Sequence, residues 1–271
     1  MKKIAKQKKI IYSILTVLLI VFILGMYFFY LQILKKDSEE AKIFISDSRD
    51  DVINENGKFN ITDNNEETNK NNVLYNSERI DKVKELQSQN SDIVGWLEIP
   101  NTEISYPILQ GIDNSYYMTH NYKNRKSKNG SLFLDKDYNW NKPSTNLLIY
   151  GHNNRGTREM FVDLLNYKDE NFYKDHPIVR FTTEKEDAIY DIISVFLSRV
   201  YYKRETDVFR YYYFIDANNK EEFDYYVSES KKASLYNIDA TAEYGDQLIT
   251  LSTCEFSQED GRFVVVARKQ K

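Results

Sequence analysis

The sequence predicts a mostly β domain whose strands close into a barrel. From about residue 75 to residue 271, many short runs of β-branched and aromatic residues alternate with turn residues, a pattern typical of a closed or nearly closed barrel. These roughly 200 residues are enough for one domain with one core. The full prediction adds a helix before the first strand, helical insertions between later strands, and a single transmembrane helix that precedes the domain.

The first 36 residues have the features of a membrane anchor. Residues 10–34 contain no charged side chain, and as a helix they would extend about 37 Å, enough to cross a hydrocarbon core of about 30 Å. Five lysines precede this run and two follow it, which predicts a cytoplasmic N-terminus at residues 1–9 and an extracytoplasmic domain. A cleaved signal peptide would have a shorter apolar region and a cleavage site of small residues, which residues 35–40 lack. We therefore predict a retained single-pass anchor in the cell membrane.

A flexible polar stalk is predicted at residues 35–75, between the anchor and the domain at residues 76–271. Asn, Asp, Glu, Lys and Ser crowd this segment, and such a composition buries too little apolar surface to offset the entropy of ordering. Beyond the anchor, 30 basic residues stand against 41 acidic ones, a net charge of about −11. A nucleic-acid partner would require a basic face, so the charge balance argues against one.

The predicted strands follow one another along the domain. The first two, at residues 95–100 and 104–109, are separated by a proline and an asparagine. The remaining strands are predicted at residues 132–134, 147–150, 178–182, 188–200, 247–252 and 263–267.

Three helices are predicted around these strands. Ser77 is placed to cap a helix whose apolar side carries Ile80, Val83 and Leu86. The two insertions are predicted at residues 160–165 and at residues 220–232, the second with an apolar face made of Phe223, Tyr226 and Val227.

Three reactive side chains stand at the ends of predicted strands. Cys254, the only cysteine, ends the Thr-Leu-Ser-Thr-Cys run at 250–254, Arg262 begins the next strand, and His152 follows the strand at 147–150. A thiolate attacks a carbonyl carbon, an imidazole transfers protons, and a guanidinium stabilises an oxyanion. The three together predict covalent acyl transfer. The compartment supports a reactive thiol, because structural cysteines outside the cytoplasm normally pair.

Each of these residues also has a structural interpretation. His152 can be a core histidine with both ring nitrogens hydrogen-bonded, and Cys254 can be an inert buried thiol. Arg262 can be a surface ion-pair partner of one of the nearby acids, which are Glu255, Glu259 and Asp260. Arg268, directly after the predicted strand at 263–267, is a rival guanidinium.

The sequence offers no metal or cofactor site. Residues 135–139 begin like a calcium loop, but Trp140 stands where a glycine is needed and Asn146 where a bidentate glutamate is needed. Three scattered histidines and one cysteine make no zinc site, and His120 and His176 are interpreted as structural or exposed. We predict that the protein uses no cofactor.

Three stretches of the chain resemble the sortase family, the membrane-anchored transpeptidases of Gram-positive bacteria, and its class B in particular. They are residues 92–100 with the Tyr-Pro pair at 106–107, the Tyr-Gly-His-Asn run at 150–153 with Met-Phe at 160–161, and the 250–254 run with Arg-Phe-Val-Val at 262–265. The stretch between residues 200 and 247, with its predicted helix, resembles the helix-bearing insertion that marks class B.

The resemblance implies a two-step reaction. Cys254 would cleave a sorting signal near the C-terminus of a secreted protein, after a threonine, and a peptidoglycan amine would resolve the thioacyl enzyme. His152 would protonate the departing amine and deprotonate the incoming one, and Arg262 would hold the oxyanion or the carbonyls of the signal. An Asn-Pro-x-Thr-Asn signal and a Pro-x-Thr-Gly signal both remain open, as do a glycine-bridge and a diaminopimelate acceptor.

Four more residues are predicted to contact the substrate. Ser252 and Thr253 precede Cys254 on its strand. The family pattern Asn-x-x-x-Leu, which lines the signal groove, is matched by Asn114 and Met118, with methionine in place of leucine.

Two other classes of function remain open from the sequence. A cysteine peptidase would use the same three side chains with water as the acceptor, and a product assay with and without an amine separates it from a transpeptidase. A non-catalytic, membrane-tethered binding module would keep Cys254 as a buried thiol that reacts with a thiol probe only after unfolding.

Overall fold

The computed structural model describes residues 19–20, 22–28 and 66–271 of the chain. The predicted cytoplasmic segment, most of the predicted anchor and the predicted stalk up to residue 65 lie outside the described residues. Residues 19–20 and 22–28 are helical, and in the described part of the chain no helix has both the length and the apolar character needed to cross a bilayer. The chain forms two compact units, residues 1–61 and 62–271, and every element named below belongs to the second.

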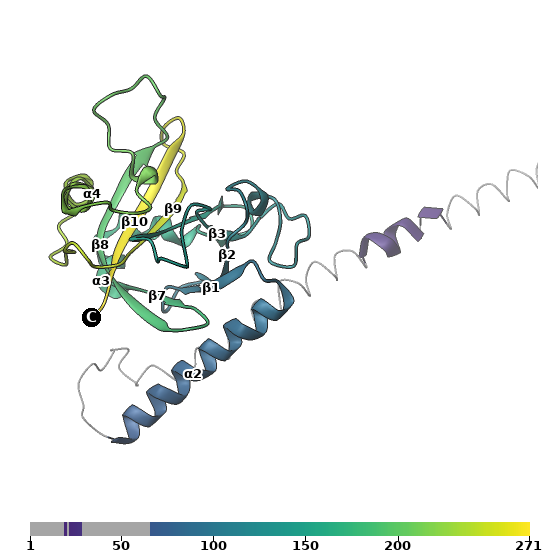
Figure 1. The fold of residues 1–271 in the computed structure, drawn as a ribbon. Helices are drawn as coiled ribbons and strands as arrows, with labels where there is room; N and C mark the ends of the chain where they lie inside the picture. Colours follow the sequence, from purple (N-terminus) through teal and green to yellow (C-terminus); the bar gives the residue numbers. More distant parts are fainter. Residues whose placement is uncertain (1–18, 21, 29–65) are drawn as a thin grey trace, which may run out of the picture. The chain divides into compact units, whose positions relative to one another are not determined.

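A closed barrel forms the centre of the second unit, as predicted (Figure 1). The strand order around it is β1-β2-β3-β4-β9-β10-β8-β7. The β2–β3 and β4–β9 pairs are parallel, and the other pairs are antiparallel. The strands are β1 (Ile93–Glu98), β2 (Ser105–Leu109), β3 (Leu132–Leu134), β4 (Asn146–Gly151), β7 (Ile178–Thr182), β8 (Asp187–Arg199), β9 (Leu248–Cys254) and β10 (Gly261–Lys269).

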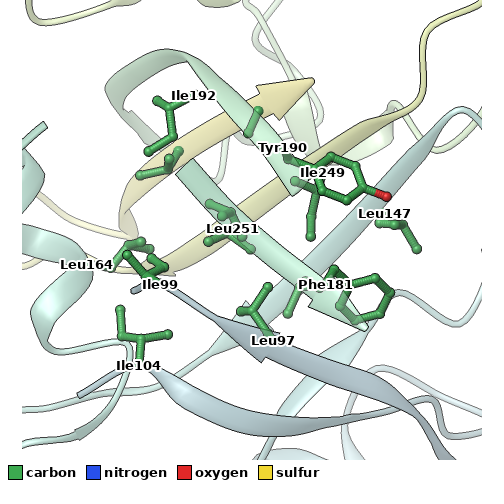
Figure 2. Packing of buried hydrophobic residues seen from close by; sticks show 14 of the residues in the cluster. Leu97, Ile99, Ile104, Leu147, Leu164, Phe181, Tyr190, Ile192, Ile249 and Leu251 are labelled. Atoms are coloured by element: carbon green, nitrogen blue, oxygen red, sulfur yellow. The ribbon is translucent and has the colours of Figure 1, made fainter. Parts of the chain in front are cut away.

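Strands β9 and β10 are buried on both faces, and the two faces pack against different groups of side chains. One face contributes Ile249, Leu251, Phe263 and Val265 to the barrel interior, where Figure 2 shows Leu97 and Phe181 approaching from other strands. The opposite face contributes Leu248, Val264 and Val266 to a second apolar cluster on the outside of the barrel. Double burial explains the uninterrupted apolar run of β10, because a half-exposed strand would alternate with polar residues.

Helix α4 (Lys220–Ala233) covers this outer face, and it confirms the predicted second insertion (Figure 1). It begins where the side chain of Asn219 accepts a hydrogen bond from the backbone N–H of Glu222, and it buries Phe223 and Tyr226 against the strands. Its position matters for function, because the outer face of β9 carries Cys254 at its end.

Helix α2 (Glu66–Gln89) precedes the barrel and is longer than predicted. The prediction that Ser77 caps it is wrong, because the helix begins eleven residues earlier; residues 66–75, assigned above to the stalk, belong to it. The predicted apolar side is confirmed at Val83, which is 1% exposed. Arg79 forms an ion pair with Glu98 of β1 and so ties the helix to the barrel.

The predicted helix at residues 160–165 is wrong in part. Residue 160 ends a two-stranded sheet made of β5 (Asn153–Asn154) and β6 (Glu159–Met160). This sheet is followed by a 3-10 helix, η2 (Asp163–Lys168), and by a short α-helix, α3 (Glu170–Asp175). Met160 has a φ of 63°, and its N–H donates to the hydroxyl of Tyr106, while the N–H of Phe161 donates to the carbonyl of His152. These contacts with distant segments override the local helical pattern.

Gly151, directly before His152, is packed too closely to accept a side chain. A Cβ at this position would overlap the side chain of Leu132 and lie 2.6 Å from Cδ2 of Phe161. We expect Gly151→Ala to lower the free energy of unfolding by about 1–3 kcal/mol and to displace the end of β4.

Gly156 provides the matched control, because a Cβ there would meet no atom within 4 Å. Gly156→Ala is expected to change stability by less than about 0.5 kcal/mol. Urea unfolding of the two variants checks the prediction, and equal stabilities would contradict it.

Candidate active site

The pairing of three strands brings His152, Cys254 and Arg262 into one row. Cys254 is the direct partner of Arg262 in the antiparallel β9–β10 pair. In the parallel β4–β9 pair Gly151 is the partner of Thr253, so His152, one residue further, reaches the level of Cys254. Because neighbouring strands lie about 4.8 Å apart, the three residues are neighbours in space, although His152 lies about 100 positions before the other two in sequence.

The side chains of this row share the outer face of the barrel. On β9 they alternate so that Ile249 and Leu251 point inward, whereas Leu248 packs in the outer cluster, which places Cys254 outward. The same alternation places Arg262 outward with Val264 on β10, and His152 outward with Leu148. All three residues are half-buried. The structure therefore brings together the three residues that the sequence predicted as catalytic.

One ring nitrogen of His152 is engaged and the other is not. Its Nε2 lies 2.8 Å from the backbone oxygen of Met118. A carbonyl oxygen only accepts hydrogen bonds, so Nε2 carries the hydrogen and Nδ1 is the nitrogen that exchanges a proton. Nδ1 has no hydrogen-bond partner among the described residues. This differs from a core histidine, whose two nitrogens would both be satisfied.

Arg262 makes no ion pair with any carboxylate in the described part of the chain. Its Nη1 donates to the backbone oxygens of Asp260 and Gly261, at 3.2 and 2.9 Å. These two hydrogen bonds fix the orientation of the guanidinium and leave most of its N–H groups free to bind a ligand. The rival Arg268 is engaged elsewhere, since its Nη2 donates to Asp191 at 2.8 Å. A positive, half-buried guanidinium on the strand partner of Cys254 suits an oxyanion or the backbone carbonyls of a peptide.

Asn153 fixes the end of the cysteine strand and was not predicted from the sequence. Its Nδ2 donates to the backbone oxygen of Cys254 at 3.0 Å, while its buried Oδ1 has no hydrogen-bond partner. It therefore connects the segment of His152 directly to that of Cys254. The only feature of the sequence that could have indicated this role is the position of Asn153 in the Tyr-Gly-His-Asn run at 150–153. Cys254 itself is a free, half-buried thiol, unlike the buried thiol that a binding module would require.

Ser252 and Thr253 have internal partners. Both are 2% exposed; the Oγ of Ser252 lies 2.7 Å from the hydroxyl of Tyr211, and the Oγ1 of Thr253 donates to the carbonyl of Gly151 at 2.8 Å. Burial raises the pKa of Tyr211 above its usual range, so this hydroxyl stays neutral. The two residues hold β9 in place, and their contact with substrate stays a prediction.

Asn114 also has an internal role, whereas Met118 lies beside the site. The Nδ2 of Asn114 donates to Asp135 at 2.9 Å, and its Oδ1 accepts from the backbone N–H of Lys136 at 2.8 Å. Asp135 also accepts from the hydroxyl of Tyr150 at 2.9 Å, which links this loop to β4. Met118 is 43% exposed and its carbonyl holds His152. The role of Asn114 in the signal groove stays a prediction.

Glu255 is a buried anion next to Cys254. Burial opposes its ionisation, but hydrogen bonds from Lys168 and Ser257 outweigh burial and lower the pKa of the carboxyl to about 2. Because the pKa of Glu255 is lower in the folded state than its ordinary value of 4.5, the ionised carboxylate stabilises the fold above pH 4.5. This stabilisation is lost as the pH falls from 4.5 to about 2. We expect Glu255→Gln to destabilise the protein at pH 7 and the difference from wild type to shrink below pH 4.5.

Urea unfolding between pH 7 and pH 3 measures this effect. Glu259→Gln is the control, because Glu259 accepts only a long hydrogen bond, 3.4 Å, from the hydroxyl of Tyr202. A difference between Glu255→Gln and wild type that stays constant with pH would contradict the assignment.

Comparison with known proteins identifies the family. A family model described as the sortase domain matches residues 97–270. Sortase B of Listeria monocytogenes is 39% identical over 196 residues, which cover 70% of this chain and 74% of that protein, and sortase B of Staphylococcus aureus is 30% identical over 189 residues, which cover 69% and 74%.

Solved structures agree with the sequence matches. A mutant form of Clostridium perfringens sortase B superposes with a TM-score of 0.65 at 29% identity, covering 74% of this chain and 92% of that one. A Staphylococcus aureus sortase B–substrate complex superposes with a TM-score of 0.61 at 26% identity, covering 76% and 99%. The chain thus belongs to the sortase family, within class B, and its activity is that of a cysteine transpeptidase.

Proposed function

We propose that Cys254 is the nucleophile of this transpeptidase, with His152 as its acid and base and Arg262 as its oxyanion donor. The observation that carries the proposal is the row of these three side chains on adjacent strands, with one nitrogen of His152 and most donors of Arg262 unused. In the first step the thiol of Cys254 gives its proton to Nδ1 of His152 and the sulfur bonds to the threonine carbonyl carbon. The scissile C–N bond then breaks as His152 passes this proton to the departing amine.

The second step reverses the proton transfer. The incoming amine gives its proton to His152 and bonds to the carbonyl carbon, and the C–S bond of the thioacyl enzyme breaks as His152 returns the proton to the sulfur. Arg262 stabilises the negative oxygen of both tetrahedral intermediates, and its rigid fork of donors suits this better than a lysine ammonium would. The enzyme returns to its starting state without a cofactor.

The proposed donor is a sorting signal near the C-terminus of a secreted protein, of the Asn-Pro-x-Thr-Asn or Pro-x-Thr-Gly type. The proposed acceptor is an amine of a cell-wall peptide, so that the secreted protein becomes attached to peptidoglycan. Two relatives support peptide substrates, since one solved structure is a sortase B–substrate complex and another is a sortase B complexed with triglycine.

The proposed location is the outer side of the cell membrane, with residues 10–34 as a single-pass anchor. The uncharged run of 25 residues and the lysines on its cytoplasmic side support this orientation. An extracytoplasmic site also agrees with the use of a lone cysteine, which has no partner in its own chain for a disulfide.

Product analysis tests the proposed reaction. The full-length chain is incubated with peptides that bear each signal, with and without a peptide amine, and the products are separated by mass. We expect cleavage after threonine with one signal type and a transfer product that replaces the hydrolysis product when amine is present. Hydrolysis at an unchanged rate and yield in the presence of amine would instead indicate a peptidase.

A further inference from the structure

An exposed cation–π pair joins the segment that follows His152 to the segment that follows Cys254. Arg155 lies three residues after His152, and its guanidinium carbon lies 5.0 Å from the centroid of the Phe256 ring. Phe256 lies two residues after Cys254 and is 60% exposed, and Arg155 is exposed as well. The pair therefore lies at the surface and joins the two segments that follow the reacting residues. We call it the Arg155–Phe256 pair.

The charge of Arg155 is not neutralised by the protein. Its guanidinium makes no hydrogen bond or ion pair with any described residue. The neighbouring carboxylates have other partners: Glu255 binds Lys168, Glu159 accepts from Asn129, and Asp163 faces Arg158 at 3.8 Å. The positive charge of Arg155 therefore remains available to a ligand.

Two other basic side chains stand close to the Arg155–Phe256 pair. The Oδ1 of Asn129 accepts from Asn154 at 3.1 Å and from Thr157 at 3.4 Å, which binds two loops together. Each of the three hydrogen-bonded residues has an exposed basic neighbour in the sequence. These basic residues are Lys128, Arg155 and Arg158. Beyond its anchor the chain carries about 11 more acidic than basic residues. Because Arg158 faces Asp163, Lys128 and Arg155 carry the positive charge that attracts anions to this surface.

The chemistry of the second step indicates which anion fits there. His152 takes a proton from the incoming amine, so the amine must arrive beside His152, and Arg155 lies three residues further along the same segment. A guanidinium stacked on a ring keeps its N–H edge free, and that edge binds a carboxylate through two parallel hydrogen bonds. The geometry favours an acceptor that carries a carboxylate close to its amine.

We propose that the Arg155–Phe256 pair binds a carboxylate adjacent to the acceptor amine. This inference rests on the proposed function and narrows it. The side-chain end of diaminopimelate carries an amine and a carboxylate on one carbon, whereas the amino end of a glycine bridge has no adjacent carboxylate. The acceptor of this enzyme is therefore of the diaminopimelate type.

A comparison of two acceptors tests the proposal on the full-length chain. The thioacyl enzyme is formed with a signal peptide and then resolved by a diaminopimelate-containing peptide or by the same peptide with the adjacent carboxylate amidated. We expect Arg155→Gln to slow resolution by the carboxylate acceptor about tenfold and by the amidated acceptor less than about twofold. The rate of thioacyl-enzyme formation should not change.

Arg204→Gln is the matched control, because Arg204 is also exposed and lies 5.4 Å from the ring centroid of Tyr202. It should leave both resolution rates unchanged. An equal loss with both acceptors, no loss with either, or an equal effect of Arg204→Gln would overturn the proposal. Slower thioacyl-enzyme formation in Arg155→Gln would also overturn it, by assigning the guanidinium to the departing peptide. If wild type forms no thioacyl enzyme, the proposed function itself fails, and this inference fails with it.

Discussion

Replacing Cys254 with alanine is expected to lower the rate of signal-peptide cleavage by at least about 10⁴-fold, because no other side chain in the row can form the thioacyl bond. His152 and Arg262 would remain in place, but they can only assist an attack by water. The fold should survive the change, since Cys254 is half-buried and its contact with Asn153 uses the backbone carbonyl rather than the thiol.

Cleavage of a fluorescence-quenched signal peptide measures this loss, and thermal unfolding of the same sample verifies the fold. Tyr226→Phe is a useful reference variant, because its hydroxyl bonds to Thr250 four residues before Cys254 on the same strand. Tyr226→Phe should lower stability and keep the cleavage rate within about threefold of wild type, whereas Cys254→Ala should lower the rate and keep the fold. Cleavage by Cys254→Ala at more than a few per cent of the wild-type rate would contradict the role of the thiol.

Replacing Arg262 with methionine is expected to slow thioacyl-enzyme formation by about 10²–10³-fold, the usual cost of removing an oxyanion donor. Methionine keeps much of the side-chain volume and removes the charge. Arg262→Lys should recover only part of the rate, because an ammonium restores the charge without the planar fork that two backbone carbonyls now orient.

The control for Arg262 is Arg268→Met on the same strand. Arg268 pairs with Asp191 at the far end of β10, so this change should affect stability more than rate. Rapid-quench measurements of the first turnover separate thioacyl-enzyme formation from its resolution. A first-turnover rate of Arg262→Met within about threefold of wild type would exclude an oxyanion role for this residue.

The strands were predictable because the barrel uses patterns that are local in sequence. β3 and β7 were predicted to the residue, and β4, β8, β9 and β10 to within two residues at each end, since apolar β-branched runs end at turn residues there. The start of α2 was not predictable, because its first turns are polar and carry no apolar stripe. Met160 was predicted as helical because the local pattern does not reveal the hydrogen bond from its N–H to Tyr106.

The candidate site was predictable in its three principal residues and not in the residues that hold them. His152, Cys254 and Arg262 lie in short motifs at strand ends, and strand pairing alone then aligns them. Tyr211 and Asp135 were missed because their partners Ser252, Tyr150 and Asn114 lie 15 to 41 positions away in the sequence. Conversely, Asn114 matched a family pattern, but its amide is occupied by an internal contact that no motif records.

The central claim is that Cys254 carries the acyl group between donor and acceptor, and the intact mass of the protein during turnover tests it most directly. The full-length chain is mixed with a signal peptide, and the reaction is quenched in acid. The intact mass of the protein is then measured by mass spectrometry, and the modified residue is located after proteolytic digestion. We predict a mass increase equal to the signal up to its threonine, located on Cys254 and lost when a peptide amine is added. Cleavage of the signal without any adduct in wild type, together with continued cleavage by Cys254→Ala, would contradict it.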